Sequence, residues 1–341
     1  MKARDRFVAA CRFEKVDRPP VWLMRQAGRY LPEYRDLRQQ HSFWDMVRTP
    51  ALAIEATMQP IRRYGMDAGI LFSDILPILD AMGAQVAFHE GGPVIGKTVR
   101  SAADLAALKP FVASRDLPYV GEAVRGLCEQ LHPERALIGF SGAPLTLAAY
   151  LIEGKGSKDL KQLKTLAYRE PALVHKLLQL LAEGVADLLS FQIECGVDAV
   201  QVFDTWAGLL TPEDYRSLAL PYQRLVVELL KDKGVPVILY MRGYASNLED
   251  AVSTGADVLS LDTSVDLGQV RTRLGTRVAL QGNLDPIALF APVESVVERT
   301  RSLIEGSLGQ GHILNLGQGL VPETPVEGVA AFVNTAQEYG A

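Results

Sequence analysis

Eight short apolar segments recur along this chain, and longer segments with helical periodicity separate them. The apolar segments span residues 21–23, 68–72, 136–140, 199–203, 235–240, 258–261, 278–280 and 313–316. Strands that are apolar along their whole length are typical of a parallel sheet that is buried on both faces. Eight strand and helix units in one chain favour a closed (β/α)8 barrel over an open doubly wound sheet. The sequence therefore predicts an α/β fold of the TIM-barrel type.

Helical periodicity is clearest in residues 171–196, where leucine and valine recur every three or four positions. Elsewhere, helix starts are marked by a capping side chain directly before a proline, at Thr49, Thr211, Asp285 and Thr324. Glu327 follows Thr324 by three residues, so we expect a capping box there.

Residues 86–108 interrupt the alternation of strands and helices. The glycine-rich turn at residues 89–93 lies between two short apolar runs and predicts a β-hairpin, inserted between the second and third barrel strands. Glycine is spread over the whole chain, and no low-complexity linker divides it. We therefore expect a single domain spanning residues 1–341.

The composition excludes several classes of protein. With 48% hydrophobic and 22% charged residues, the chain is typical of a soluble globular protein, and a net charge of −5 argues against a general binder of nucleic acid or acidic membranes. Cys11, Cys128 and Cys195 are scattered, which suggests neither a disulfide framework nor a zinc site and suits a reducing cytoplasm. No apolar run approaches 18 residues and the first residues carry no long apolar core, so neither membrane insertion nor secretion is expected.

Directly after the first apolar segment, two arginines lie four positions apart on either side of a glycine. Each guanidinium offers a planar fork of donors to a carboxylate or phosphate, worth about 1.5–3 kcal/mol per charge-assisted hydrogen bond. Gly28 allows the backbone to approach a ligand closely. Arg25 and Arg29 are therefore predicted to form an anion clamp, although the pair alone is also compatible with surface salt bridges.

Polar side chains follow most of the predicted strands, at the end of a barrel where active sites lie. These residues are Arg25, Ser73, Asp74, Ser141, Gly142, Asp204, Thr205, Met241, Arg242, Asp262, Asn283, Gly317 and Gln318. Asp74 follows an entirely apolar strand, so its carboxylate should be partly desolvated and should need a partner. In a structural role, Asp74 would cap the N-terminus of a helix or form a salt bridge with an arginine. In a functional role, it would accept hydrogen bonds from several N–H groups of a ligand. Arg242 is expected to pair with Asp262.

The segment at residues 18–35 resembles the N-terminal signature of the uroporphyrinogen decarboxylase family, carboxy-lyases of haem biosynthesis that use no cofactor. The resemblance continues through FSDIL at 72–76, GFSGAP at 139–144, YLIEG at 150–154, FDTWAG at 203–208 and QGNLDP at 281–286. It implies a cytoplasmic homodimer that converts uroporphyrinogen III into coproporphyrinogen III and carbon dioxide.

The resemblance also implies roles for individual residues. The segment Arg25, Gln26, Ala27, Gly28 and Arg29 matches the family's substrate-binding segment, whose arginines pair with substrate carboxylates. Asp74 matches the aspartate that accepts hydrogen bonds from the pyrrole N–H groups and stabilises the cationic intermediate. Tyr150 and Thr205 match polar residues that contact the substrate, and Arg38 is a candidate for binding a further carboxylate.

The residue inventory agrees with chemistry of this kind. Decarboxylation leaves an electron pair that must be delocalised, and the sequence has no Schiff-base motif, dinucleotide fingerprint or metal cluster to receive it. A porphyrinogen can supply its own electron sink, because protonation of a pyrrole carbon creates a cationic ring. Asp74 would stabilise that cation. Arg25, Arg29 or an ordered water is the candidate proton donor.

Gln318 departs from the family pattern, which usually has a histidine between two glycines at this place. Glutamine can donate a hydrogen bond to a carboxylate but cannot become cationic, so we expect preserved geometry with reduced affinity, or little effect. The departure leaves open a catalytically impaired, tetrapyrrole-binding relative. A corrinoid-type methyltransferase is a further alternative, but none of the five histidines lies two residues before a cysteine, as its zinc thiolate site requires.

Overall fold

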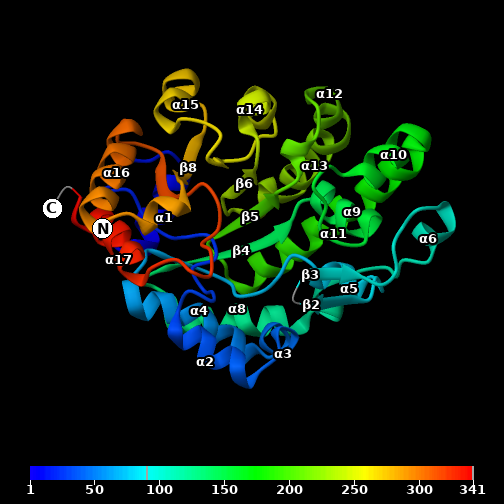
Figure 1. The fold of residues 1–341 in the computed structure, drawn as a ribbon, viewed down its shortest axis with the longest axis horizontal. Coiled ribbons are helices and arrows are strands. Elements are labelled where there is room, and N and C mark those ends of the chain that lie inside the picture. Colours follow the sequence, from blue (N-terminus) through cyan, green and yellow to red (C-terminus); the bar gives the residue numbers. More distant parts are fainter. Residues whose placement is uncertain (90, 340–341) are drawn as a thin grey trace.

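The computed structural model describes residues 1–89 and 91–339, and its centre is a curled sheet of seven parallel strands (Figure 1). The strand order is β1-β4-β5-β6-β7-β8-β9. The strands are β1 (Ala68–Ile70), β4 (Ala136–Gly142), β5 (Ala199–Asp204), β6 (Val237–Met241), β7 (Val258–Ser260), β8 (Ala279–Leu284) and β9 (His312–Leu316). Seven of the eight predicted strands are therefore present, each within a few residues of its expected bounds.

The eighth position in the sheet is filled by residues 20–23. Leu314 of β9 donates its N–H to the carbonyl of Pro20 (2.8 Å), and on the other side Asp67 donates its N–H to the carbonyl of Val21 (2.9 Å). Val21 alone forms a parallel β-bridge, to Leu314, so the strand predicted at 21–23 is a single bridge and not a regular strand. The predicted TIM-barrel fold is confirmed, with this short segment between β9 and β1.

Helices surround the sheet (Figure 1). They are α1 (Ala3–Cys11), α2 (Pro32–Gln40), α3 (Phe43–Arg48), α4 (Pro50–Tyr64), α5 (Pro77–Ala81), α6 (Ala102–Ala106), α7 (Ala113–Asp116), α8 (Pro118–Leu131), α9 (Pro144–Glu153), α10 (Lys161–Arg169), α11 (Pro171–Cys195), α12 (Pro212–Asp214), α13 (Leu220–Leu230), α14 (Tyr244–Val252), α15 (Leu267–Leu274), α16 (Val293–Gly306) and α17 (Val326–Glu338). Short 3-10 or π-helical turns are η1 (Ala207–Leu209), η2 (Tyr215–Ala219), η3 (Lys231–Lys233) and η4 (Pro286–Phe290). The long helix predicted at 171–196 is confirmed as α11.

The predicted helix starts are confirmed in part. Thr211 caps α12 through its hydroxyl, which accepts a hydrogen bond from the N–H of Asp214 (3.1 Å). Asp285 caps η4, because its Oδ1 accepts the N–H of Ile287 (2.9 Å), although η4 is a 3-10 helix instead of an α-helix. Thr49 precedes α4 without a hydrogen bond from its own side chain to the helix.

The capping box at Thr324 and Glu327 was a wrong prediction. The Thr324 hydroxyl donates to the carbonyl of Val321 (2.9 Å) and accepts from its N–H (3.2 Å). Because the preceding turn occupies this hydroxyl, α17 begins only at Val326, without a side-chain cap.

The predicted hairpin is present between β1 and β4. It consists of the antiparallel strands β2 (Val86–His89) and β3 (Gly92–Ile95), and Glu90 of the predicted turn lies outside the described residues. Ile95 donates its N–H to the carbonyl of Gly154 (2.7 Å), and Val94 forms an antiparallel bridge with Lys155. The hairpin is therefore attached to the chain directly after α9.

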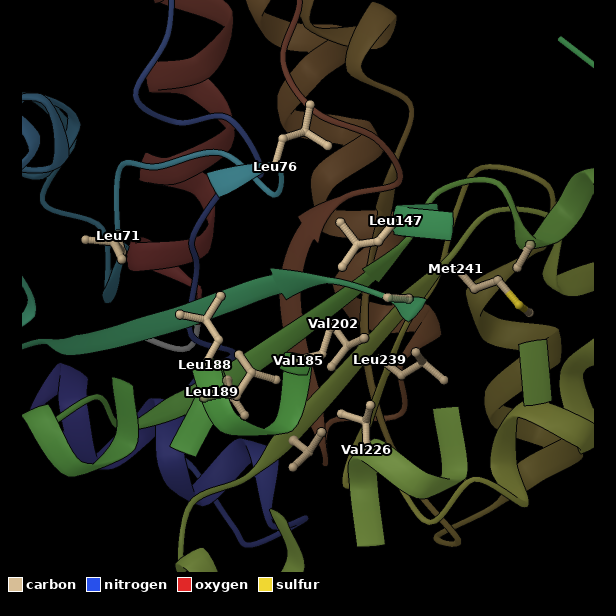
Figure 2. Close-up of a cluster of buried hydrophobic side chains, with 14 of the residues drawn as sticks. Leu71, Leu76, Leu147, Val185, Leu188, Leu189, Val202, Val226, Leu239 and Met241 are labelled. Atoms are coloured by element: carbon tan, nitrogen blue, oxygen red, sulfur yellow. The ribbon is translucent and has the colours of Figure 1, made fainter. Parts of the chain in front are cut away.

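The apolar core has two parts. Inside the barrel, Trp22, Ile138, Ile238 and Ile313 form a buried cluster, to which α1 adds Phe7. Outside it, helix side chains pack against the sheet. Figure 2 shows Val185, Leu188 and Leu189 of α11 gathered with Val202 of β5, Leu239 of β6 and Val226 of α13.

A buried ion cluster holds the closing segment at the amino end of β1. Asp67 is 1% exposed and forms ion pairs of 2.8 Å with both Arg6 and Arg18. Its carboxylate also accepts the N–H of Val21 (2.9 Å). Among the described residues, no helix is long and apolar enough to cross a membrane.

Candidate active site

The polar residues predicted from strand ends lie around the carboxyl end of the barrel, on separate elements. Arg25 follows the closing segment, Asp74 follows β1, Thr205 follows β5 and Gln318 follows β9, whereas Tyr150 lies on α9. Carboxyl ends of parallel strands in a closed barrel meet at one face, and the charges of Arg25 and Asp74 both act on Tyr150.

Asp74 is the acidic group of this site. Its Oδ1 accepts the N–H of Leu76 (2.9 Å), and no side chain among the described residues donates to it. Burial raises the pKa of Asp74 to about 6, while the backbone N–H and the charge of Arg25 act in the opposite direction. Within residues 1–89 and 91–339, Asp74 has neither an ion pair nor a complete set of donors, so its carboxylate can accept hydrogen bonds from a ligand.

Arg25 is the cation whose charge lowers the pKa of Asp74. Its side chain is exposed, and its charge lowers the pKa of Asp74, Tyr150 and Tyr240. The backbone at Arg25 is left-handed, with φ at 62°, which is uncommon for a residue other than glycine. An unusual backbone conformation at a charged residue in a site is typical of a functional constraint.

Tyr150 lies close to both charges. Its pKa is raised to about 12, mainly by burial and in part by the charge of Asp74, against the opposing charge of Arg25. Its ring packs against Trp206, with ring centroids 4.4 Å apart. A phenol with this pKa stays protonated at neutral pH and can donate a hydrogen bond to an anion.

Arg29 lies in a different environment from Arg25. Burial raises the pKa of Tyr34, and the charges of Arg38 and Arg29 lower it, so both cations lie near this ring. Arg38 also donates to the carbonyl of His41. The charge of Arg25 therefore acts on Asp74, and the charges of Arg29 and Arg38 act on Tyr34.

Gln26 does not present its side chain to the site. It is fully buried; its Oε1 accepts the N–H of Leu23 (3.1 Å), and its Nε2 donates to the carbonyl of Ala68 (3.3 Å). These bonds tie the arginine segment to β1. Ala27 and Gly28 are half-buried, and a Cβ on Gly28 would lie 3.0 Å from the Arg25 carbonyl oxygen. The side chain of Gln26 is thus occupied by backbone groups of the chain and holds the arginine segment against β1.

The strand end of β5 supplies one buried and one available polar residue. Asp204 is fully buried and accepts hydrogen bonds from Thr146 Oγ1 and Gln223 Nε2, both at 2.7 Å. Burial raises the pKa of Asp204 to about 6, and these two donors lower it in part. Thr205 is half-buried, and its side chain makes no hydrogen bond within the described residues.

The predicted ion pair between Arg242 and Asp262 was wrong. Asp262 accepts hydrogen bonds from the N–H of Gly243 (2.9 Å) and the hydroxyl of Ser264 (2.6 Å). These local donors occupy both carboxylate oxygens, and Arg242 is exposed. Within the described part of the chain, no ion pair joins the two residues.

Three aromatic rings inside the top of the barrel were missed by the sequence argument. Phe203 of β5 lies between Phe140 of β4 and Tyr240 of β6, with ring centroids 5.7 Å from each. Each stands at or near the carboxyl end of its strand, where a large side chain inside a barrel must border the site. All three are the last residues of predicted apolar segments, and this position could have revealed that aromatic rings line the bottom of the site. We call these three rings the aromatic floor.

Comparison with known proteins agrees with this geometry. The family model described as uroporphyrinogen decarboxylase (URO-D) matches residues 2–339. Proteins named uroporphyrinogen decarboxylase from Parasynechococcus marenigrum and Roseiflexus sp. are each 46% identical to the chain, over 96% and 99% of it and 94% and 99% of the relatives. The chain belongs to the uroporphyrinogen decarboxylase family.

A solved structure supports the fold of this uroporphyrinogen decarboxylase family member. A methyltransferase from Methanosarcina mazei aligns over 100% of both chains with a TM-score of 0.84 at 21% identity. At this identity the likeness shows the barrel alone. Among the described residues of the chain, no group of three His, Cys, Asp or Glu side chains is arranged to hold a metal ion.

Gln318 lies half-buried in the loop after β9. Tyr240 donates its hydroxyl to the carbonyl of Gly317 (3.2 Å), and Leu320 donates its N–H to the carbonyl of Met24 (3.1 Å). The loop is thereby fixed against the arginine segment, with Gln318 between these two attachments. An amide at this point can donate a hydrogen bond beside Arg25 but adds no charge.

Proposed function

We propose that this chain decarboxylates the four acetate side chains of uroporphyrinogen III to methyl groups, giving coproporphyrinogen III and carbon dioxide. The observation that carries the assignment of the site is Asp74, a half-buried carboxylate with one backbone donor and Arg25 nearby. Family membership supports the reaction, and the arrangement of charges supports the place where it occurs.

The first chemical step is protonation of a pyrrole carbon next to the acetate. The ring becomes cationic, and the ionised Asp74 stabilises it through the pyrrole N–H groups, which need the acceptor that Asp74 offers. Because the pKa of Asp74 is about 6, this carboxylate is charged at neutral pH. Arg25, Arg29 or an ordered water delivers the proton, and water bound by an arginine is the better acid, since guanidinium itself holds its proton tightly.

Carbon dioxide then leaves. The bond between the methylene and the carboxylate breaks, its electron pair flows into the cationic ring, and the exocyclic carbon gains a double bond. A proton adds to that carbon to form the methyl group, and the proton on the pyrrole carbon is lost. Each acetate therefore consumes one proton and releases one carbon dioxide, with the substrate ring as the electron sink and no cofactor required.

The remaining carboxylates of the substrate are held by separated cations. Arg25 lies beside Asp74, and Arg29 with Arg38 forms a second positive region near Tyr34. Tyr150, Thr205 and Gln318 add neutral donors at other points of the rim. A flat, octa-anionic ring fits such an arrangement better than a single phosphate, and the aromatic floor of Phe140, Phe203 and Tyr240 faces its apolar surface.

A tetrapyrrole-binding protein without catalysis is the second candidate, and Gln318 is the observation that favours it. Purified protein should be incubated anaerobically with enzymatically generated uroporphyrinogen III, and the products should be oxidised and separated by carboxylate number. Four-carboxylate coproporphyrin, formed without added metal or cofactor, is the expected result. Retention of all eight carboxylates in bound substrate would replace the decarboxylase with the binder.

The family also supports a homodimer in the cytoplasm built from one domain per chain. Scattering or sedimentation at micromolar concentration should give twice the mass of the single chain, and a monomer would contradict the dimer. Calorimetric unfolding should give one cooperative transition, since separate domains unfold separately.

A further inference from the structure

Gly319 lies directly against the side chain of Arg25. A Cβ built on Gly319 would be 2.5 Å from Cδ, 2.7 Å from Cγ and 3.0 Å from Nε of Arg25. These three atoms belong to the middle of the side chain and not to its flexible end. The stem of Arg25 therefore passes across the bare α-carbon of Gly319 on its way to the guanidinium.

The backbone of Arg25 has little freedom to move away from such a Cβ. Met24 donates its N–H to Asn315 Oδ1 (3.1 Å) and accepts the N–H of Leu320 (3.1 Å). Gln26 donates its N–H to the carbonyl of Leu23 (3.0 Å), and its side chain is bonded to β1. Arg25 already has φ at 62°, so its neighbours hold it in one conformation from both sides.

We propose that Gly319 is a positioning residue, which leaves room for the Arg25 side chain in the conformation whose charge acts on Asp74. With a methyl group at position 319, Arg25 must take another rotamer, and its guanidinium leaves the site. This inference rests on the proposed function, in which Arg25 binds a substrate carboxylate beside Asp74. Gly319 does not have a left-handed φ, so alanine at this position differs from glycine mainly in occupied space.

The test compares Gly319→Ala with Gly156→Ala. At Gly156, a Cβ would meet no heavy atom within 4 Å, and φ is again not left-handed, so this variant is a matched control. We expect Gly319→Ala to lower kcat/KM by about 10–100-fold, because small displacements of a binding group have large kinetic effects, and Gly156→Ala to leave it unchanged.

The pH profile separates positioning from general damage to the fold. The charge of Arg25 lowers the pKa of Asp74, so withdrawal of that charge raises it. The acid limb of kcat/KM should move to higher pH in Gly319→Ala by about half a unit or more. A loss of activity with an unmoved acid limb would overturn the proposal.

A double-mutant cycle with Arg25→Ala completes the test. Without the arginine stem, the space at position 319 is free, so Gly319→Ala should cause less than about a twofold further loss. Losses that multiply independently would overturn the proposal. If Gly319→Ala alone does not fold, the double variant Arg25→Ala with Gly319→Ala should have the melting temperature of Arg25→Ala. A lower melting temperature of the double variant would also overturn the proposal.

A binding measurement tests the role of Gly319 independently of the proposed decarboxylation. Absence of turnover by the unaltered protein would reject the decarboxylase and leave positioning to be measured with uroporphyrin III, a fluorescent octacarboxylate. Gly319→Ala should then weaken binding of this probe by up to the loss that Arg25→Ala causes, and unchanged binding would reject positioning.

Discussion

The two ends of strand β1 carry aspartates seven residues apart, and their surroundings are opposite. Asp67 at the amino end is buried, forms ion pairs with Arg6 and Arg18 and accepts a backbone N–H. Asp74 beyond the carboxyl end has one backbone donor and an arginine that influences its pKa without forming an ion pair. In the part of the chain that the structure describes, the carboxylate of Asp67 has a full set of partners and that of Asp74 does not.

This difference separates a structural charge, that of Asp67, from the charge of Asp74, for which we propose a role in function. A buried carboxylate that is fully paired stabilises the junction between the closing segment and the barrel, and removal of one partner leaves the others uncompensated. A carboxylate that is desolvated but incompletely paired has a raised pKa and a high affinity for N–H donors, which is the state expected of a group that stabilises a cationic intermediate.

The largest expected effect is the loss of catalysis in Asp74→Asn. An amide keeps the size of the side chain and its acceptor for the Leu76 N–H but removes the negative charge that we propose stabilises the pyrrole cation. We expect kcat/KM to fall by about 100–1000-fold, in line with the loss of one electrostatic group from an active site. Anaerobic product analysis measures the loss.

Folding provides the control for Asp74→Asn. The pKa of Asp74 is raised in the folded state, so its ionised form opposes folding at neutral pH, and the melting temperature of Asp74→Asn should be equal or higher at pH 8. A lower melting temperature, or activity within a few fold of the unaltered protein, would contradict the functional role.

At the other end of β1, Asp67→Asn should act on stability. Removal of the charge leaves Arg6 and Arg18 without their shared buried partner, and the expected loss is about 3–5 kcal/mol in the free energy of unfolding. Urea denaturation measures this loss. The exposed Asp36 provides the control, because Asp36→Asn should change stability by less than about 0.5 kcal/mol. Strongly reduced kcat/KM in folded Asp67→Asn would break the contrast between the two ends.

The pH profile of the enzyme should show an acid limb near pH 6. Burial raises the pKa of Asp74 to about 6, so the carboxylate is lost as the pH falls through this value, and kcat/KM should drop about tenfold per unit below it. Asp204 has a pKa of about 6 as well, but Thr146 and Gln223 occupy its carboxylate. The residual activity of Asp74→Asn should therefore lack this limb, and a limb that persists would point to Asp204.

The contribution of these two carboxyls to the free energy of unfolding should change with pH in the opposite direction to kcat/KM. The pKa values of Asp74 and Asp204 are raised in the folded state, so both carboxyls favour folding most below about pH 4, where they are protonated in both states. Their contribution declines as the pH rises through about 6. Pair-forming acids such as Asp17, whose pKa is lowered mainly by its hydrogen bond with Arg6, oppose this trend.

The sequence predicted the barrel and the place of Asp74 for the same reason. Strands buried on both faces appear in the sequence as repeated apolar segments. A carboxylate that follows such a segment is expected to be partly desolvated, and this expectation does not depend on the strand's place in the barrel. The errors concern the partners of polar groups. Gln26, Asp262 and Thr324 each bond to backbone or side-chain groups nearby, and sequence spacing does not reveal which of several partners within reach is chosen. The left-handed backbone at Arg25 was not predicted either, because no residue type signalled it.

The smallest expected effect is that of Gln318→His. This variant tests whether the site lacks a cationic partner for a substrate carboxylate at position 318. Histidine with an ordinary pKa of about 6.5 adds partial positive charge near neutral pH and keeps a donor for a carboxylate. We expect kcat to stay similar or rise up to about threefold, with KM lowered more at pH 6 than at pH 8, because only the cationic ring adds attraction. The exposed Gln162 supplies the control Gln162→His, which should change neither constant. If turnover depends completely on the histidine, Gln318 has disabled the site, and the chain binds tetrapyrroles without converting them.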